Sequence, residues 1–345
     1  MPRFNLRIPR PRALVLGAAV VIAAIVVVVN QPGRAPTQPR VAAATRTTSA
    51  APLIGLDEPA SPISSGLRVL HAHYDFRDAT AKHPGAPSIN VAGGVLLDVD
   101  NGRILWAKGA HAALPPASTT KIVTALVALE NFDPEKEVDV TPDALFAAAD
   151  ETKLGVEAGD HYTVTELLQA MLTISANDAA DALAVDTVGM QRYVTAMNEQ
   201  LAALGLQDSH FDTPVGLDGP TQLASPYDLA VAALAAYDNF PIFRDIVGQQ
   251  AIDVPATSGH IQYTLHNLNR LLGLYPPAKG IKPGWTGDAG YCLVALAERS
   301  GHRLVLSLMN DPKLYEDAKA MFEWGFGQLG LPPLPTSTPS PTPHR

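Results

Sequence analysis

Residues 291–309 read YCLVALAERSGHRLVLSLM, which is two apolar runs joined by a polar turn. The runs cover 291–297 and 303–309, and each is short, continuous and rich in Leu, Val and Ala. Runs of this length between turn residues are typical of strands buried on both faces. The stretch therefore predicts two neighbouring buried strands with a turn over 298–302.

A similar pattern occurs about 200 residues earlier in the sequence. An apolar run over 91–99 is followed by Asp100-Asn101-Gly102 and by a second apolar run over 103–107. An Asn-Gly pair between two such runs is a strong hairpin signal, because both residues tolerate positive φ. Strands are therefore expected near both ends of the folded region.

The sequence between these strands favours helices. Apolar residues repeat at helical spacing from Ile122 to Leu129, after a Pro-Pro-Ala-Ser sequence at 115–118 that should open a helix. Further helices are expected over 163–173, 178–188, 191–204, 226–237 and 313–326. Terminal strands around a helix-rich block predict an α+β domain, in which the two terminal segments share one antiparallel sheet.

The N-terminus indicates a membrane anchor. Residues 13–29, ALVLGAAVVIAAIVVVV, carry no charge and are just long enough to cross a bilayer as a helix. Four arginines within 1–12 should keep that basic segment in the cytoplasm. A cleaved signal peptide is the alternative, because VAAAT at 41–45 offers small residues. These residues lie well beyond the apolar run, so an uncleaved anchor is favoured.

Two further segments should not fold on their own. Residues 30–66 are rich in Pro, Ala, Thr, Ser and Gly, which predicts a flexible linker. Residues 331–345 are dominated by Pro, Ser and Thr and should form a disordered tail. A single folded domain is therefore expected over 67–330.

Charge and cysteine content exclude several classes of function. The chain has a net charge of −9, although its first 12 residues are basic. A body this acidic would repel a phosphate backbone, so no nucleic-acid partner is expected. One cysteine, Cys292, excludes an intramolecular disulfide and a zinc–cysteine site, and its apolar strand suggests a core residue. His71 and His73 with Asp75 offer metal-ligand side chains, but their polar setting is more typical of exposed histidines than of a metal site.

Ser118 and Lys121 form a Ser-x-x-Lys sequence at the start of a predicted helix. Residues i and i+3 share a helix face, so the lysine amine can reach the serine hydroxyl. Serine becomes a good nucleophile when a neighbouring base takes its proton, and burial can lower a lysine pKa enough for that role. A surface helix start is the competing interpretation of this short motif.

Two other short motifs carry polar groups suited to a cleft. Ser175 and Asn177 lie between two predicted helices, where they could face a substrate or simply cap a helix. Lys282-Pro283-Gly284 precedes the strand at 291–297. A lysine at a strand edge followed by glycine could present a cation and a free backbone N–H to a bound carbonyl, or the segment could form an ordinary turn.

The three motifs in this order resemble the penicillin-recognising serine acyl-enzyme families. The longer strings ASTTKIVTALVALE at 117–130, LLQAMLTISANDAADALA at 167–184 and GIKPGWTGDAGYCLVA at 280–295 are similar to D-alanyl-D-alanine carboxypeptidases, the low-molecular-weight penicillin-binding proteins of peptidase family S11. FDTPVGLDGP at 211–220 is similar to that family too. The resemblance covers about residues 88–327.

The resemblance implies a DD-peptidase fold with a helical subdomain, and a reaction that needs neither metal nor cofactor. Ser118 would be the nucleophile and Lys121 its base, while Ser175 would relay the proton to the leaving amine with electrostatic help from Lys282. The substrate-binding residues would be Asn177, Gly284, Trp285 and Thr286, with the N–H groups of Ser118 and Trp285 forming the oxyanion hole. The implied partners are peptidoglycan stem peptides and, as covalent inhibitors, β-lactam antibiotics, and the implied location is outside the bacterial cell membrane.

The sequence departs from the family pattern at three places. Pro283 replaces the usual threonine of Lys-Thr-Gly, so Thr286 is expected to contact the substrate carboxylate instead. The arginine that follows the last strand in many relatives has no clear match, and Lys313 is the nearest cation. Thr213 replaces the asparagine of an Asn-Pro-x-Gly-Leu sequence.

Two other functions remain compatible with the motifs. A class A β-lactamase would need a deacylating glutamate between the second and third motifs, and Glu199 is the single glutamate between 178 and 281. A non-catalytic cell-wall binding protein with the same fold is favoured by Pro283, but the five polar residues of the three motifs argue against it.

Overall fold

A computed structural model describes residues 64–78, 83–148 and 151–335. The predicted anchor at 13–29 and most of the predicted linker lie outside these residues. Within the described part of the chain, no helix has both the length and the apolar character needed to span a membrane.

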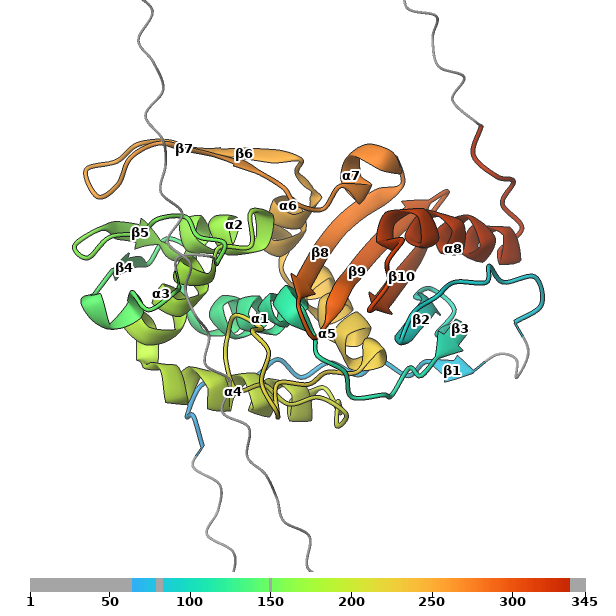
Figure 1. Ribbon diagram of the computed structural model, residues 1–345, viewed down its shortest axis with the longest axis horizontal. Helices are drawn as coiled ribbons and strands as arrows, with labels where there is room; N and C mark the ends of the chain where they lie inside the picture. Colours follow the sequence, from blue (N-terminus) through green and yellow to red (C-terminus); the bar gives the residue numbers. More distant parts are fainter. Residues whose placement is uncertain (1–63, 79–82, 149–150, 336–345) are drawn as a thin grey trace, which may run out of the picture. The chain divides into compact units, whose positions relative to one another are not determined.

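The main sheet contains six strands in the order β1-β3-β2-β10-β9-β8 (Figure 1). Its strands are β1 (Arg77–Asp78), β2 (Gly93–Asp98), β3 (Arg103–Lys108), β8 (Ala278–Thr286), β9 (Gly290–Arg299) and β10 (His302–Met309). β10 pairs antiparallel with both β2 and β9, so the C-terminal strands join the N-terminal hairpin. The predicted antiparallel sheet shared by the terminal segments is confirmed, with the short β1 added parallel to β3.

Both faces of the sheet are covered, as the continuous apolar runs predicted. Along β10, Leu304 and Leu306 pack with α8 (Leu314–Gln328), whereas Val305 belongs to the cluster that contains α5 (Pro226–Asn239). Successive strand residues point to opposite faces, so a strand covered on both sides must be apolar at every position.

Most of the residues between β3 and β8 form a helical part of the domain, which lies beside the β8 edge of the sheet (Figure 1). Its helices are α1 (Lys121–Asn131), α2 (Val164–Thr173), α3 (Asn177–Val188), α4 (Met190–Ala203), α6 (Pro241–Gly248), the short α7 (Leu271–Leu274), and the 3₁₀ turns η1 (Ala117–Thr120) and η2 (Pro142–Ala144). α1 is buried along most of its length and packs against α2, α4 and α5. Thr163 and Glu166 form a capping box that starts α2 one residue later than predicted.

Two small two-stranded sheets were not predicted. β4 (Glu137–Asp139) pairs with β5 (His161–Thr163), and β6 (Ala251–Val254) pairs with β7 (Tyr263–His266). The buried ring of His260, from the loop between β6 and β7, links the two sheets because it stacks on Tyr162 of β5 at a centroid distance of 4.5 Å. Strands of three or four residues carry too little apolar periodicity to be recognised from sequence.

Of the two expectations for 282–284, the strand edge agrees with the structure and the ordinary turn does not. These residues lie inside β8, the edge strand beside β9. Proline and glycine are poor strand formers, which explains why the segment was not identified as a strand. Proline is tolerated on an edge strand because one side of that strand has no ladder partner.

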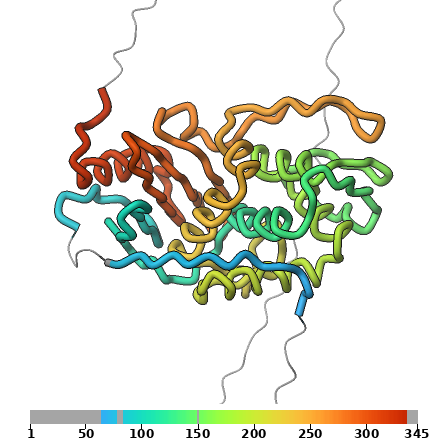
Figure 2. Tube along the Cα trace, turned by 180° about the vertical axis from the view of Figure 1, so that it is seen from behind, coloured from blue at the N-terminus to red at the C-terminus, as the bar shows by residue number. Residues whose placement is uncertain are grey.

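The folded region extends slightly beyond 67–330 at both ends. Residues 64–78 run along the back of the domain from α4 towards the sheet (Figure 2), and Ser65 is buried with its N–H bonded to Glu199 Oε1 at 3.1 Å. At the other end, Leu334 N donates to Glu323 Oε2 of α8 at 3.0 Å. Residues 64–66 and 331–335 therefore pack on the domain, although they were assigned to the linker and the tail.

Candidate active site

Ser118 lies on the 3₁₀ turn η1, immediately before α1 begins at Lys121. The predicted helix therefore starts with a tighter turn at the serine. The preceding Ala117 is fully buried with a φ of +49°, which is uncommon for a residue with a Cβ. Such a backbone persists only when its surroundings fix it, and it is found most often at functional sites.

Two glycines allow the chain to pack tightly around Ser118. A Cβ on Gly216, whose φ is +85°, would lie 2.0 Å from the carbonyl oxygen of Ala117. A Cβ on Gly284 of β8 would lie 2.8 Å from the Ser118 nitrogen. No side chain fits at either position, so the two glycines set how closely the 214–216 loop and β8 approach the serine.

Lys121 is completely buried, and its Nζ makes three hydrogen-bonding contacts. Nζ lies 3.1 Å from Ser118 Oγ, 2.6 Å from Asn177 Oδ1 and 2.7 Å from the Val215 carbonyl oxygen. Burial lowers the pKa of Lys121 to about 7, against opposing attraction from Asp181 and Glu151. The predicted proximity of the Ser118 and Lys121 side chains is therefore observed.

The three contacts suit the neutral amine as well as the ammonium. A neutral lysine has two N–H donors and one lone pair. Two carbonyl oxygens, from Asn177 and Val215, can hold the two N–H groups, which leaves the lone pair directed at the Ser118 hydroxyl. This is the arrangement required of a base that removes the serine proton.

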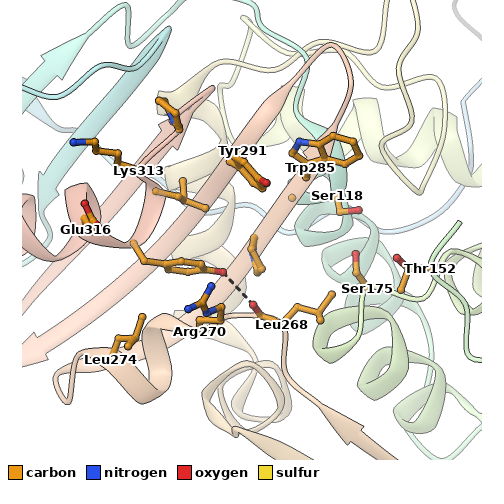
Figure 3. Close-up of a pocket in the computed structure, with 15 residues that line it drawn as sticks. Ser118, Thr152, Ser175, Leu268, Arg270, Leu274, Trp285, Tyr291, Lys313 and Glu316 are labelled. Carbon is orange, nitrogen blue, oxygen red and sulfur yellow. Dashed lines mark hydrogen bonds between the residues drawn. The ribbon is translucent and has the colours of Figure 1, made fainter.

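Ser175 and Asn177 come from the junction of α2 and α3. Ser175 has a φ of +65°, a second strained non-glycine residue close to the nucleophile, and its side chain lines the same cleft as Ser118 (Figure 3). Asn177 is buried at the first position of α3. The junction is therefore more than a helix cap, because Asn177 contacts Lys121 and Ser175 lines the cleft with Ser118.

Lys282 points a second buried amine into the same region. Its side chain is fully buried, and Nζ donates to the Pro283 carbonyl oxygen at 3.1 Å. Burial, with a smaller effect from the charge on Lys121, holds the pKa of Lys282 well below its ordinary value. A charge on Lys121 therefore disfavours a second charge on Lys282.

A cleft of about 870 Å³ extends from the two serines to the start of α8 (Figure 3). Near Ser118 its wall is formed by Gly284 and by the exposed aromatic rings of Trp285 and Tyr291, whose centroids are 6.3 Å apart. Further along, the cleft is lined by the cations Arg270 and Lys313. An apolar wall with a few convergent charges is typical of a ligand site.

Thr286 does not line this cleft. Its hydroxyl donates to Asp218 Oδ1 at 2.5 Å and accepts from Ala289 N at 3.1 Å, so it closes the turn between β8 and β9. A role for Thr286 in binding a carboxylate stays a prediction, and it would require exchange of the bond to Asp218.

Three residues of the site were missed by sequence reasoning. Val215 contributes only its backbone carbonyl, which no residue pattern reveals. Glu151 accepts a hydrogen bond from Asn177 Nδ2, and Arg270 lines the cleft from the segment before α7. The similarity of 211–220 to a known family was the available signal for Val215, but it carried no chemical role.

Glu199, the candidate deacylating glutamate, lies on α4 and accepts the N–H of Ser65 at 3.1 Å. It therefore serves to hold the N-terminal segment of the domain, as its helical pattern suggested.

Comparison with known proteins gives a consistent result. A family model described as D-alanyl-D-alanine carboxypeptidase, of peptidase family S11, matches residues 80–313. D-alanyl-D-alanine carboxypeptidase DacB2 of Mycobacterium tuberculosis is 36% identical over 240 residues, which cover 67% of this chain and 81% of that protein. DacF of Bacillus subtilis is 31% identical, and the match covers 70% of this chain but 63% of that longer protein.

Solved structures of the same group are similar over most of the described domain. A D-alanyl-D-alanine carboxypeptidase from Mycobacterium tuberculosis aligns with a TM-score of 0.65 at 33% identity, over 72% of this chain and 96% of that one. The Streptomyces K15 DD-transpeptidase aligns with a TM-score of 0.65 at 30% identity, over 70% and 99% of the two chains.

Proposed function

The chain belongs to the D-alanyl-D-alanine carboxypeptidase family of serine peptidases, and on that premise we propose that it removes the terminal D-alanine from peptidoglycan stem peptides. The reaction would pass through an acyl-enzyme on Ser118. The observation that carries this proposal is the buried Lys121 amine, 3.1 Å from Ser118 Oγ and held from behind by two carbonyl oxygens.

In the first half of the reaction, Ser118 Oγ attacks the carbonyl carbon between the two D-alanines, while Lys121 Nζ takes the hydroxyl proton. Ser175 then gives its hydroxyl proton to the leaving amine and takes the proton held by Lys121, so the C–N bond breaks, D-alanine departs and Lys121 is neutral again. In the second half, water attacks the Ser118 ester carbonyl while Lys121 takes a proton from that water. The same proton passes to Ser118 Oγ as the ester C–O bond breaks, which releases the shortened peptide.

The negative charge on the tetrahedral carbonyl oxygen needs donors, and two backbone N–H groups support it. Ser118 N lies close to β8, as the 2.8 Å separation between it and a Cβ placed on Gly284 shows. Trp285 follows Gly284 on the same edge strand, and alternate N–H groups of an edge strand are free to face a ligand. We assign the oxyanion hole to the N–H groups of Ser118 and Trp285.

The substrate peptide would lie along the β8 edge. Asn177 Nδ2 has two hydrogens, and since Glu151 takes one, the second can hold the substrate amide. The family resemblance gives Lys282 an electrostatic role in the proton transfer by Ser175, and its amine is buried near Lys121. For the terminal carboxylate of the substrate, Arg270 and Lys313 are the exposed cations of the cleft.

Penicillin provides the most direct test, because a β-lactam would acylate Ser118 in place of the peptide and block it. A fluorescent penicillin should label the purified domain covalently, and unlabelled penicillin should prevent this. Ser118→Ala should abolish both labelling and D-alanine release from a peptide ending in D-Ala-D-Ala. Ser258→Ala, which removes an exposed hydroxyl outside the cleft, should label normally. Full labelling of Ser118→Ala would refute the assignment.

Relatives of this chain are bacterial enzymes of the cell wall, and we propose that residues 13–29 hold the domain on the outer side of the cell membrane. The apolar run and its preceding arginines support this. The full-length protein should sediment with membranes, whereas residues 64–335 alone should stay in the supernatant. Recovery of the protein from the medium with an N-terminus after residue 30 would favour a cleaved signal instead.

A further inference from the structure

We propose that Glu151 is a positioning residue for acylation of Ser118, which it serves by fixing the Asn177 side-chain amide against Lys121. This inference rests on the proposed function. Glu151 lies in the loop between η2 and β5 and belongs to none of the three motifs that the sequence revealed.

Glu151 is held in place from both sides. Its Oε2 accepts a hydrogen bond from Asn177 Nδ2, and its Oε1 accepts one from Ala148 N at 2.9 Å. Its side chain is half-buried next to Thr152, which lines the active-site cleft. The carboxylate therefore contacts the site through Asn177 and does not itself touch Ser118.

The loop that carries Glu151 is tied to the start of α3. Asn177 N donates to the Thr152 carbonyl oxygen at 2.8 Å. The buried Asp178 carboxylate accepts the N–H groups of three successive loop residues, Leu154, Gly155 and Val156, at 2.9, 2.7 and 3.1 Å. These bonds fix the position of the loop that carries Glu151 relative to Asn177 at the start of α3.

A carboxylate at this position determines which way the Asn177 amide points. An ionised carboxylate only accepts hydrogen bonds, so the NH₂ end of the amide must face Glu151. The oxygen end then faces Lys121 Nζ, at 2.6 Å. In the reversed orientation the amide oxygen would face a carboxylate and the NH₂ group would face the lysine donors. Glu151 thereby keeps a carbonyl oxygen on Lys121 and leaves the lysine lone pair directed at Ser118.

The charge on Glu151 also acts on Lys121 directly. The charged groups around Lys121 are Asp178 and Asp181 from α3, Lys282 from β8 and Glu151 from the loop. The Glu151 charge raises the pKa of Lys121, so it favours the ammonium and opposes the base form. Loss of that charge should lower the pKa of Lys121 even while it disturbs Asn177.

Two opposite effects are therefore expected from one substitution. Glu151→Ala should lower the acylation rate at high pH, where Lys121 is neutral, by roughly ten- to a hundredfold, as for loss of one hydrogen bond to a charged group. The midpoint of the rate against pH should at the same time move to lower pH. Glu151→Gln, which keeps an oxygen that can accept from Asn177 but removes the charge, should lose less rate and shift the midpoint in the same direction.

The experiment measures the second-order rate constant for labelling by fluorescent penicillin from pH 5 to pH 9, for both variants and for Glu157→Ala. Glu157 is an exposed carboxylate on the same loop, and its removal should change neither the rate nor the midpoint. Thermal melting of each variant checks that it is folded. Failure of the unmodified protein to label would overturn the proposed function, whereas a difference between the unmodified protein and the Glu151 variants tests this inference alone.

If both Glu151 variants label like the unmodified protein at every pH, Glu151 does not position the site. If Glu151→Ala is slower but its midpoint is unmoved, Glu151 supports the fold only. Either result overturns the proposal.

Discussion

Acylation of Ser118 should depend on pH over the neutral range through deprotonation of Lys121, which is coupled to that of Asp181. Lysine has an ordinary pKa of 10.5, and burial lowers that of Lys121 to about 7. At pH 7 roughly half of the molecules then carry the neutral amine, whereas an ordinary lysine would provide only about one in 3,000. Because the base is the deprotonated form, the rate should rise with pH, by about tenfold per unit below pH 7, and level off above about pH 8.

The perturbation that isolates this effect is Lys121→Arg. A guanidinium remains protonated throughout the accessible range, so the variant should lose acylation at every pH. Lys279→Arg, at an exposed lysine on β8, is the matched control and should keep the full profile.

The assay follows fluorescent penicillin labelling under pseudo-first-order conditions between pH 5 and pH 9. Asp181 also titrates, because burial raises its pKa to about 7, so the measured midpoint belongs to the coupled pair. A flat profile between pH 6 and pH 8, or a midpoint near the ordinary lysine value, would refute the assignment of Lys121 as the base.

Three further predictions follow from single contacts. Gly284→Ala should slow acylation at least about tenfold, because the added Cβ would lie 2.8 Å from the Ser118 backbone nitrogen. Gly287→Ala is the control: a Cβ there has no atom within 4 Å, so the acylation rate should not change. Burial raises the pKa of Asp181 from 3.8 to about 7 in the folded protein, so its contribution to stability is fully present below pH 3.8 and is lost as pH rises through about 7. Asp181→Asn should therefore raise the melting temperature at pH 8 relative to the unmodified protein, and raise it less at pH 4. If Thr286 contacts the substrate carboxylate, Thr286→Val should raise KM for a D-Ala-D-Ala peptide by roughly ten- to a hundredfold. Asp218→Asn weakens the hydrogen bond between Asp218 and Thr286 and should not raise KM. Equal effects of both variants would assign Thr286 to the turn alone.

The parts of the fold that could be predicted are those with strong local signals. The apolar runs at 291–297 and 303–309 became the central strands β9 and β10, because strands covered on both faces need apolar residues at every position. The Asn101-Gly102 turn was equally clear, and Gly102 has the expected positive φ of +61°. The helix predicted at 226–237 is present as α5, and in the structure Ser225 caps it and Pro226 opens it.

The parts that were missed depend on tertiary contacts. β8 contains Pro283 and Gly284, and it becomes a strand because β9 pairs with it and η1 packs against it. Ser118, Ser175 and Lys282 could be nominated from their motifs, but their mutual geometry could not. Val215 and Glu151 reach Lys121 and Asn177 from distant parts of the sequence, and neither has a residue pattern of its own.

The position of Pro283 on the edge strand has a consequence for the behaviour of the protein in concentrated solution. A strand edge that must stay free for a peptide is also a template on which another protein chain can add a strand, which is a common start of aggregation. Proline lacks an amide hydrogen and interrupts the regular row of donors that such an added strand would need. The residue that departs from the usual Lys-Thr-Gly sequence therefore makes this part of β8 a poor partner for a strand of another copy of the chain.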